Sequence, residues 1–164
     1  MLPRVGLLEG LDDARLLGAG IRAHPRQREL LAAIAATRLT IACCGRRFGK
    51  TKAAAAAGVH NLLLVPELDA LVAPGEKRYA ISIANSQAQA RIFTEHALAL
   101  VKASPTLRRE LVSETATELT FSRNRILSAF PCTSKSTRGF AASFIVFDEF
   151  AHHYDLDEGG PAVA

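Results

Sequence analysis

The residues best suited to chemistry form a short glycine-containing segment in the first third of the chain, Gly45-Arg46-Arg47-Phe48-Gly49-Lys50-Thr51. A nucleotide phosphate needs inward-pointing backbone N–H groups, the positive end of a helix, a lysine ammonium and a hydroxyl that reaches a magnesium ion. Gly49, Lys50 and Thr51 supply the last part of this set. The segment is therefore predicted to be a phosphate-binding loop.

The residues on either side of the triplet Gly49-Lys50-Thr51 argue both against and for a phosphate-binding loop. The full phosphate-loop pattern has a glycine five positions before Gly49, whereas this chain has Cys44 there and Gly45 one place later. A Gly-Lys-Thr triplet alone can also be the start of an ordinary helix. The triplet follows an apolar segment that reads as a strand and precedes an alanine-rich stretch that favours helix, which is the context that phosphate binding requires.

A second chemical signal lies near the carboxyl end, where four apolar residues precede two carboxylates in Phe144-Ile145-Val146-Phe147-Asp148-Glu149. In a nucleotide hydrolase the carboxyl end of a central strand faces the phosphates. Asp148 is predicted to hold Mg²⁺, and Glu149 to orient and deprotonate the attacking water. The alternative is a buried strand that ends in a solvated acidic turn.

Alternating helix-like and strand-like stretches are predicted to position these two segments. Helical patterns cover residues 27–37, 50–64 and 87–102, and strand patterns cover residues 39–44, 78–84 and 144–147. Residues 118–122 and 125–130 flank Arg123-Asn124 and predict a β-hairpin. The alternation predicts an α/β fold with a mainly parallel sheet and flanking helices, in a single domain over residues 1–164.

Composition and charge narrow the class of protein. The chain has 164 residues, of which 49% are hydrophobic and 22% charged, so it can bury a core and is not a disordered regulator. Three cysteines do not form a disulfide framework, and no apolar run approaches the roughly 20 residues that span a bilayer. Residues 1–52 carry 10 basic and 4 acidic groups. This excess suits an anionic partner or a solvated face.

Together these residues resemble the ATPase domain of the large terminase subunit, which packages DNA in tailed bacteriophages. The loop Gly45–Thr51 is similar to the family's variant Walker A motif, which commonly lacks the first glycine and carries an arginine. His24-Pro25-Arg26-Gln27 looks like its adenine-recognising glutamine motif. Residues 81–90 resemble its second strand and the polar turn that follows. Residues 137–140 and 144–151 look like its arginine-glycine segment and Walker B strand.

The resemblance implies a P-loop NTPase fold of the ASCE or RecA-like class, with a β-hairpin insertion and with ATP and Mg²⁺ as ligands. It implies that Thr51 and Asp148 bind the metal and that Gln27 contacts adenine. It also implies a nucleotide site formed by Gly45, Arg47, Gly49, Lys50 and Thr51. Glu149 and Arg46 would be catalytic, with Arg46 at the γ-phosphate, although whether Arg46 or Arg47 makes that contact stays open.

The resemblance also implies partners and a location. The expected activity is ATP-driven movement of double-stranded DNA into a procapsid, with the portal protein and the small terminase subunit as partners. A full-length protein would form a homo-oligomeric ring in the host cytoplasm, at the portal vertex and away from any membrane.

Two parts of the family pattern are not found in the sequence. Only 15 residues follow Glu149, and Gly159-Gly160-Pro161 interrupts them, so no candidate remains for the coupling strand or for the nuclease domain. The chain is therefore expected to be an amino-terminal fragment whose P-loop strand and Walker B strand have unpaired edges, which favours aggregation.

Two rival functions stay open. A DEAD or DEAH helicase also has a P-loop and a glutamine motif, but it requires Asp or His where this chain has Ala151. A module that binds nucleotide or DNA without turnover is the second. The basic residues Arg123, Arg125, Lys135 and Arg138 either contact DNA phosphates or form a solvated surface.

Overall fold

The computed structural model describes residues 2, 4–132, 139–148, 154–155 and 160–161. The helices in chain order are α1 (Leu7–Asp12), η1 (Leu17–Ala19), α2 (Pro25–Ala36), α3 (Lys50–Leu63), η2 (Pro66–Leu71), α4 (Gln87–Ala103) and α5 (Pro105–Arg108), where η marks a 3₁₀ helix. The strands are β1 (Arg78–Ala84), β2 (Leu111–Glu114), β3 (Glu118–Phe121), β4 (Arg125–Pro131), β5 (Ala141–Phe147), β6 (Tyr154–Asp155) and β7 (Gly160–Pro161).

A five-stranded mixed sheet in the order β2-β3-β4-β1-β5 forms the centre of the molecule. Strand β1 runs parallel to both β4 and β5, with Ile81 opposite Ser128 on one side and opposite Ile145 on the other. The β2–β3 and β3–β4 pairs are antiparallel. The α/β fold predicted from the alternating pattern is confirmed.

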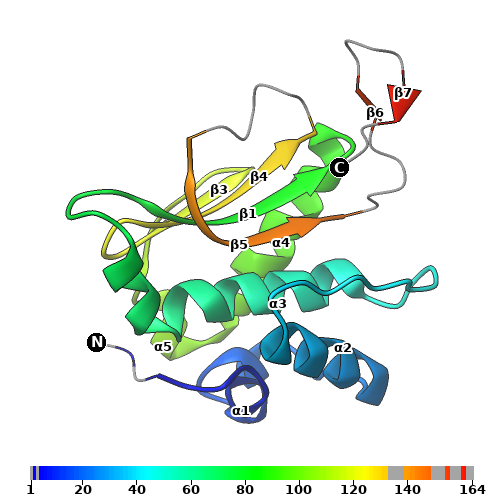
Figure 1. The fold of residues 1–164 in the computed structure, drawn as a ribbon. Helices are drawn as coiled ribbons and strands as arrows, with labels where there is room; N and C mark the ends of the chain where they lie inside the picture. Colours follow the sequence, from blue (N-terminus) through cyan, green and yellow to red (C-terminus); the bar gives the residue numbers. More distant parts are fainter. Residues whose placement is uncertain (1, 3, 133–138, 149–153, 156–159, 162–164) are drawn as a thin grey trace.

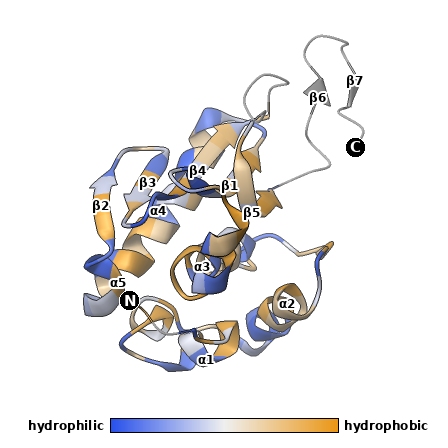
Figure 2. Ribbon diagram, turned by 60° about the vertical axis from the view of Figure 1, so that its left-hand side comes forward, coloured by the Kyte–Doolittle hydropathy of each residue, from blue (hydrophilic) through white to orange (hydrophobic). Residues whose placement is uncertain are grey.

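The helices lie in two layers on one face of this sheet (Figure 1). Helices α3 and α4 pack directly on the strands, and α1 and α2 pack on the far side of α3. The alanines of α3 let it pack closely, and Ala53, Ala55 and Ala56 are fully buried. In Figure 2 the ribbon of α3 carries both hydrophobic and hydrophilic residues, as expected of a helix with one face on the sheet. The carboxyl ends of β1, β4 and β5 point to the side of the molecule where the α2–α3 loop lies.

The β3–β4 hairpin forms where the sequence predicts it. Arg123 and Asn124 adopt left-handed conformations, with φ of 61° and 56°. Phe121 pairs with Arg125, so the loop consists of residues 122–124, and its two left-handed residues reverse the chain within this short span. Asparagine tolerates this region better than most residues.

The predicted strand over residues 39–44 is wrong. These residues have no regular secondary structure, and within the described part of the chain no strand pairs with them. Leu39 and Ile41 are 79% and 85% exposed. An apolar run becomes a strand only when a neighbouring strand satisfies its backbone groups, and none of the described strands, the open edge of β5 included, pairs with these residues.

Strand β5 is the last strand of the sheet, so one of the two predicted unpaired edges is present among the described residues. The side chains of Ile145 and Phe147 on the sheet face opposite the helices are half exposed. None of the helices that the structure describes combines the length and apolar character needed to cross a membrane.

Candidate functional site

The predicted phosphate loop is a tight turn that leads directly into α3. The Phe48 N–H donates to the Gly45 carbonyl at 3.4 Å, and the Ala53 N–H donates to the Gly49 carbonyl at 3.0 Å. Arg47 and Gly49 have φ of 62° and 82°, so two residues of the loop are left-handed. A left-handed arginine is strained, and strain of this kind is concentrated at ligand-binding segments.

The two glycines of the loop differ in what they do. A Cβ atom at Gly49 would collide with Nε2 of Gln27, and the positive φ disfavours any side chain there. Gly45 has a negative φ, and a Cβ there would meet no atom within 4 Å. The conformation of the loop therefore requires Gly49 and does not require Gly45.

Gln27 links the loop to α2. Its Nε2 donates to the Phe48 carbonyl at 2.7 Å, and its Oε1 accepts from the His24 backbone N–H at 2.9 Å. His24 Nδ1 in turn accepts from the Arg26 N–H, which completes the amino-terminal cap of α2. The predicted glutamine motif and the predicted phosphate loop are thus in direct contact.

The acid at the end of β5 also reaches the loop. Thr51 Oγ1 donates a hydrogen bond of 2.7 Å to Asp148 Oδ2, across 97 residues of sequence. The Asp148 N–H donates to the Ile83 carbonyl at 2.9 Å, which fixes the aspartate at the carboxyl end of the parallel strands. The two chemical signals of the sequence therefore meet at one place.

The chemistry available here follows from these groups. A hydroxyl and a carboxylate side by side are oxygen ligands that suit Mg²⁺, and Mg²⁺ commonly bridges them to phosphate oxygens. Arg46 and Arg47 are exposed on the loop, and Lys50 is the first residue of α3. Their positive charges and the helix amino terminus attract anions.

Some predicted residues are not among those that the structure describes. Glu149 and the segment 137–138 lie outside the described residues. Among the residues that the structure does describe, no group of three or more His, Cys, Asp or Glu side chains could hold a metal ion. A metal ion bound by Thr51 and Asp148 would therefore take its other oxygen ligands from water and from the phosphates of a bound nucleotide.

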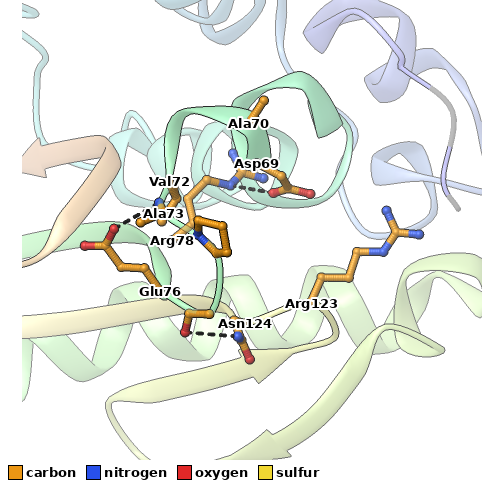
Figure 3. A pocket seen from close by; sticks show the side chains of 10 residues that line it. Asp69, Ala70, Val72, Ala73, Glu76, Arg78, Arg123 and Asn124 are labelled. Carbon is orange, nitrogen blue, oxygen red and sulfur yellow. Dashed lines mark hydrogen bonds and ion pairs between the residues drawn. The ribbon is translucent and has the colours of Figure 1, made fainter.

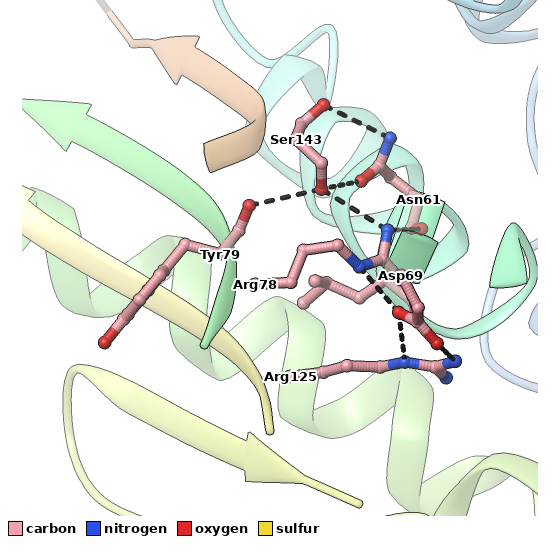
Figure 4. Close-up of polar contacts among 7 residues, drawn as sticks. Asn61, Asp69, Arg78, Tyr79, Arg125 and Ser143 are labelled. Carbon is pink, nitrogen blue, oxygen red and sulfur yellow. Dashed lines mark hydrogen bonds and ion pairs between the residues drawn. The ribbon is translucent and has the colours of Figure 1, made fainter. Parts of the chain in front are cut away.

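Arg125 is not available to DNA, contrary to one of the two interpretations of the basic residues. Only 2% of its surface is exposed, and its Nε donates to Asp69 Oδ1 at 3.1 Å. Arg78, equally buried, lies 2.9 Å from the same carboxylate oxygen through its own Nε (Figure 4). Burial alone raises the pKa of Asp69, but the hydrogen bond and charge of Arg125 and the charge of Arg78 outweigh it and hold the pKa below its usual value.

This cluster was not predicted from the sequence. Arg78 also donates to the carbonyls of Asn61 at 3.0 Å and Leu62 at 2.7 Å, so it joins β1 to the end of α3. Ser143 of β5 donates to Asn61 Oδ1 at 2.6 Å. The only signal in the sequence was a pair of arginines, each beginning an apolar strand.

A shallow pocket of about 490 Å³ lies beside the cluster (Figure 3). It is lined by residues 69–70, 72–76 and 78 and by the hairpin turn Arg123-Asn124. Arg78 and Arg125 begin β1 and β4, whereas Asp148 follows the end of β5. The pocket therefore lies at the amino-terminal ends of the parallel strands, whereas the phosphate loop lies at their carboxyl ends. The two share no residue.

Comparison with known proteins bears on the fold. No protein-family model and no curated protein sequence matches the chain. Among solved structures, the fold is similar to that of the large terminase of bacteriophage HK97, with a TM-score of 0.63 and 21% sequence identity. The similarity covers 80% of this chain and 27% of the terminase chain, so it spans about a quarter of that protein. This chain thus has the fold of part of a phage large terminase.

Proposed function

We propose that the chain is the ATP-binding part of a terminase-like ATPase, with ATP held at residues 45–51 and Mg²⁺ at Thr51 and Asp148. The observation that carries the proposal is the 2.7 Å hydrogen bond between Thr51 and Asp148. It brings the loop with phosphate-binding character next to the acid predicted to serve the metal. A surface of unrelated charges would not place these two groups in contact.

Each residue has a defined part in the proposed reaction. The loop N–H groups and Lys50 bind the phosphate chain, and Arg46 or Arg47 stabilises negative charge on the terminal phosphoryl group. Thr51 and Asp148 direct oxygen atoms at one point, and Glu149 accepts the proton of the attacking water. When bound, Mg²⁺ neutralises charge on the phosphate oxygens.

The proposed biological role is to drive double-stranded DNA into a procapsid. The proposed partners are duplex DNA, a portal protein and a small terminase subunit, in a ring of identical subunits. The fold similarity to the HK97 large terminase supports this role. The expected result is ATP hydrolysis that duplex DNA stimulates strongly and single-stranded DNA stimulates weakly.

ATP binding by purified protein tests the nucleotide site. Lys50→Ala removes the ammonium and is expected to weaken Mg·ATP binding at least tenfold in isothermal titration calorimetry. Lys52→Ala is the matched control, because it removes the same charge from the same helix two residues further on. Equal binding by Lys50→Ala and the wild type would contradict the proposal.

Glu149→Gln separates binding from hydrolysis. The amide keeps the shape of the side chain but cannot accept a proton, so ATP is expected to bind normally and not to turn over. The measurement is the rate of phosphate release from ATP, and the rate of the wild-type chain is the reference. Undiminished turnover by the variant would remove Glu149 from the proposed mechanism.

A further inference from the structure

We propose that Gln27 is a positioning residue of the phosphate loop, which acts through the Phe48 carbonyl and so controls affinity for the phosphate chain whatever base is attached. This inference rests on the proposed function for its ligand and on the hydrogen bonds of Gln27 for its geometry. It differs from the adenine contact expected from the glutamine motif.

The hydrogen bonds of Gln27 define the direction of its amide group. Its nitrogen faces a carbonyl, which can only accept, and its oxygen faces a backbone N–H, which can only donate. The amide therefore cannot be turned over without losing both contacts. One end is held by the cap of α2, and the other end holds the loop.

The position of the held carbonyl explains why the contact matters. Phe48 lies between Arg47 and Gly49, the two left-handed residues of the loop. A positive φ suits Gly49 but not Arg47, and the strain at Arg47 must be offset by fixed neighbours. The Gln27 amide occupies the space next to Gly49 that a Cβ atom would fill. The contact with Gln27 thus holds the loop in this form through groups of the chain itself.

Pre-formed anion sites bind more tightly than sites that must order on binding, because the ordering cost is already met. Releasing the Phe48 carbonyl would let the loop relax, and every ligand with a phosphate chain would then bind more weakly. A residue that reads only adenine would affect only ligands that carry adenine. This difference separates the two roles of Gln27.

Two variants test the contact. Gln27→Glu keeps the acceptor for the His24 N–H, so the cap of α2 survives, but a carboxylate cannot donate to the Phe48 carbonyl. Gln27→Met removes the donor without adding charge. Ala33→Glu, at an exposed position of the same helix, controls for the added negative charge. Circular dichroism and thermal melting establish that each variant is folded.

The first measurement is amide hydrogen exchange in the unliganded protein. Both Gln27 variants are expected to exchange faster than wild type over residues 45–52, and Ala33→Glu is expected to match wild type. Unchanged exchange in this segment would overturn the proposal. Because no ligand is needed, this result stands even if the wild-type chain binds no nucleotide, an outcome that would end the proposed function alone.

The second measurement compares ATP, GTP and inorganic tripolyphosphate. Both variants are expected to bind all three about tenfold more weakly, the factor that one hydrogen bond of ordinary strength gives. A loss confined to ATP, with tripolyphosphate unaffected, would overturn the positioning role and support an adenine contact.

A pH series gives a readout that general destabilisation would not produce. A protonated carboxyl at position 27 can donate to the Phe48 carbonyl, whereas the carboxylate cannot. The ratio of wild-type to Gln27→Glu affinity for tripolyphosphate is therefore expected to fall toward 1 as the pH is lowered from 7 through the ordinary glutamate pKa of about 4.3. A ratio that is constant over this range would contradict the proposed donor role.

Discussion

Gly45 and Gly49 stand at the two ends of one short loop, yet only Gly49 has a positive φ and a neighbour within reach of a Cβ atom. A left-handed alanine costs about 1–2 kcal/mol. Gly49→Ala would also push the Gln27 amide away from the Phe48 carbonyl. We therefore expect Gly49→Ala to lower the melting temperature and to weaken ATP binding.

Gly45→Ala is the matched control. Its melting temperature is expected to equal that of the wild type, because a Cβ atom at this position meets no other atom. Calorimetric melting of the two variants compares them directly. A lower melting temperature for Gly45→Ala would show that the loop conformation is wrong. A loss of ATP affinity at Gly45 with no loss of stability would instead indicate a contact with ligand, as the resemblance implies.

Asp148 permits a separate residue-scale prediction. Asp148→Asn keeps an oxygen that accepts from Thr51 but removes the negative charge that a divalent cation requires. ATP binding without magnesium is expected to be unchanged, and the gain in affinity on adding Mg²⁺ is expected to disappear. Calorimetry with and without Mg²⁺ measures both. An undiminished magnesium effect would place the metal elsewhere.

The chemistry of the candidate site could be predicted from the residues, but its contacts could not. The types and order of Lys50, Thr51 and Asp148 indicated phosphate and metal chemistry. Nothing in the spacing indicated that Gln27 would hold the Phe48 carbonyl, because this contact depends on how α2 approaches the loop in space. Residue type determines what a group can do, and packing determines which group it meets.

At the scale of elements, Asp69 joins η2 to two strands through a pair of buried arginines. Asp69→Asn would remove the negative charge that Arg78 and Arg125 share. Loss of one partner of a fully buried pair costs about 3–5 kcal/mol, and the partial exposure of Asp69 makes the expected cost smaller. The expected result is a lower free energy of unfolding in urea. Asp12→Asn, which breaks an exposed contact with Arg28, is the control and is expected to have a much smaller effect.

The Asp69 carboxylate also makes the stability of the fold depend on pH. Because the pKa of Asp69 is lower in the folded chain than in the unfolded chain, its stabilising contribution is complete above the unfolded pKa near 3.8 and is lost as the pH falls through the folded value. Wild-type stability is expected to drop below about pH 4. Asp69→Asn, already destabilised, is expected to show a shallower drop, and a drop of equal steepness would contradict the assignment.

Elements with a strong periodic pattern were predicted and confirmed. The predicted strand over residues 78–84 coincides with β1, and the helix predicted over residues 50–64 matches α3 within one residue. Short elements such as α1 and α5 were missed, because a turn or two of helix shows little periodicity. The segment 39–44 failed for a different reason, since strand formation depends on a partner that local sequence does not reveal.

At the scale of the whole molecule, one side of the sheet ends in β5, whose side chains Ile145 and Phe147 are half exposed. Edge strands with apolar side chains promote association between chains, and lysine on such an edge suppresses it. Ile145→Lys is therefore expected to reduce self-association as measured by light scattering. Ile92→Lys, an exposed apolar residue on α4, is the control and is expected to change little. If both substitutions reduced self-association equally, the added charge would act through the solubility of the whole protein and not through the edge strand.

The hydrogen bond between Thr51 and Asp148 also determines when the candidate site comes into being during synthesis. Its two ends are 97 residues apart, so a ribosome working at about 5–20 residues per second makes the second end about 5–20 seconds after the first. Throughout that interval the nascent chain carries a cationic loop without its acid. On the proposed function, a newly made chain would gain metal-dependent nucleotide affinity only after β5 and Asp148 have been added to the sheet.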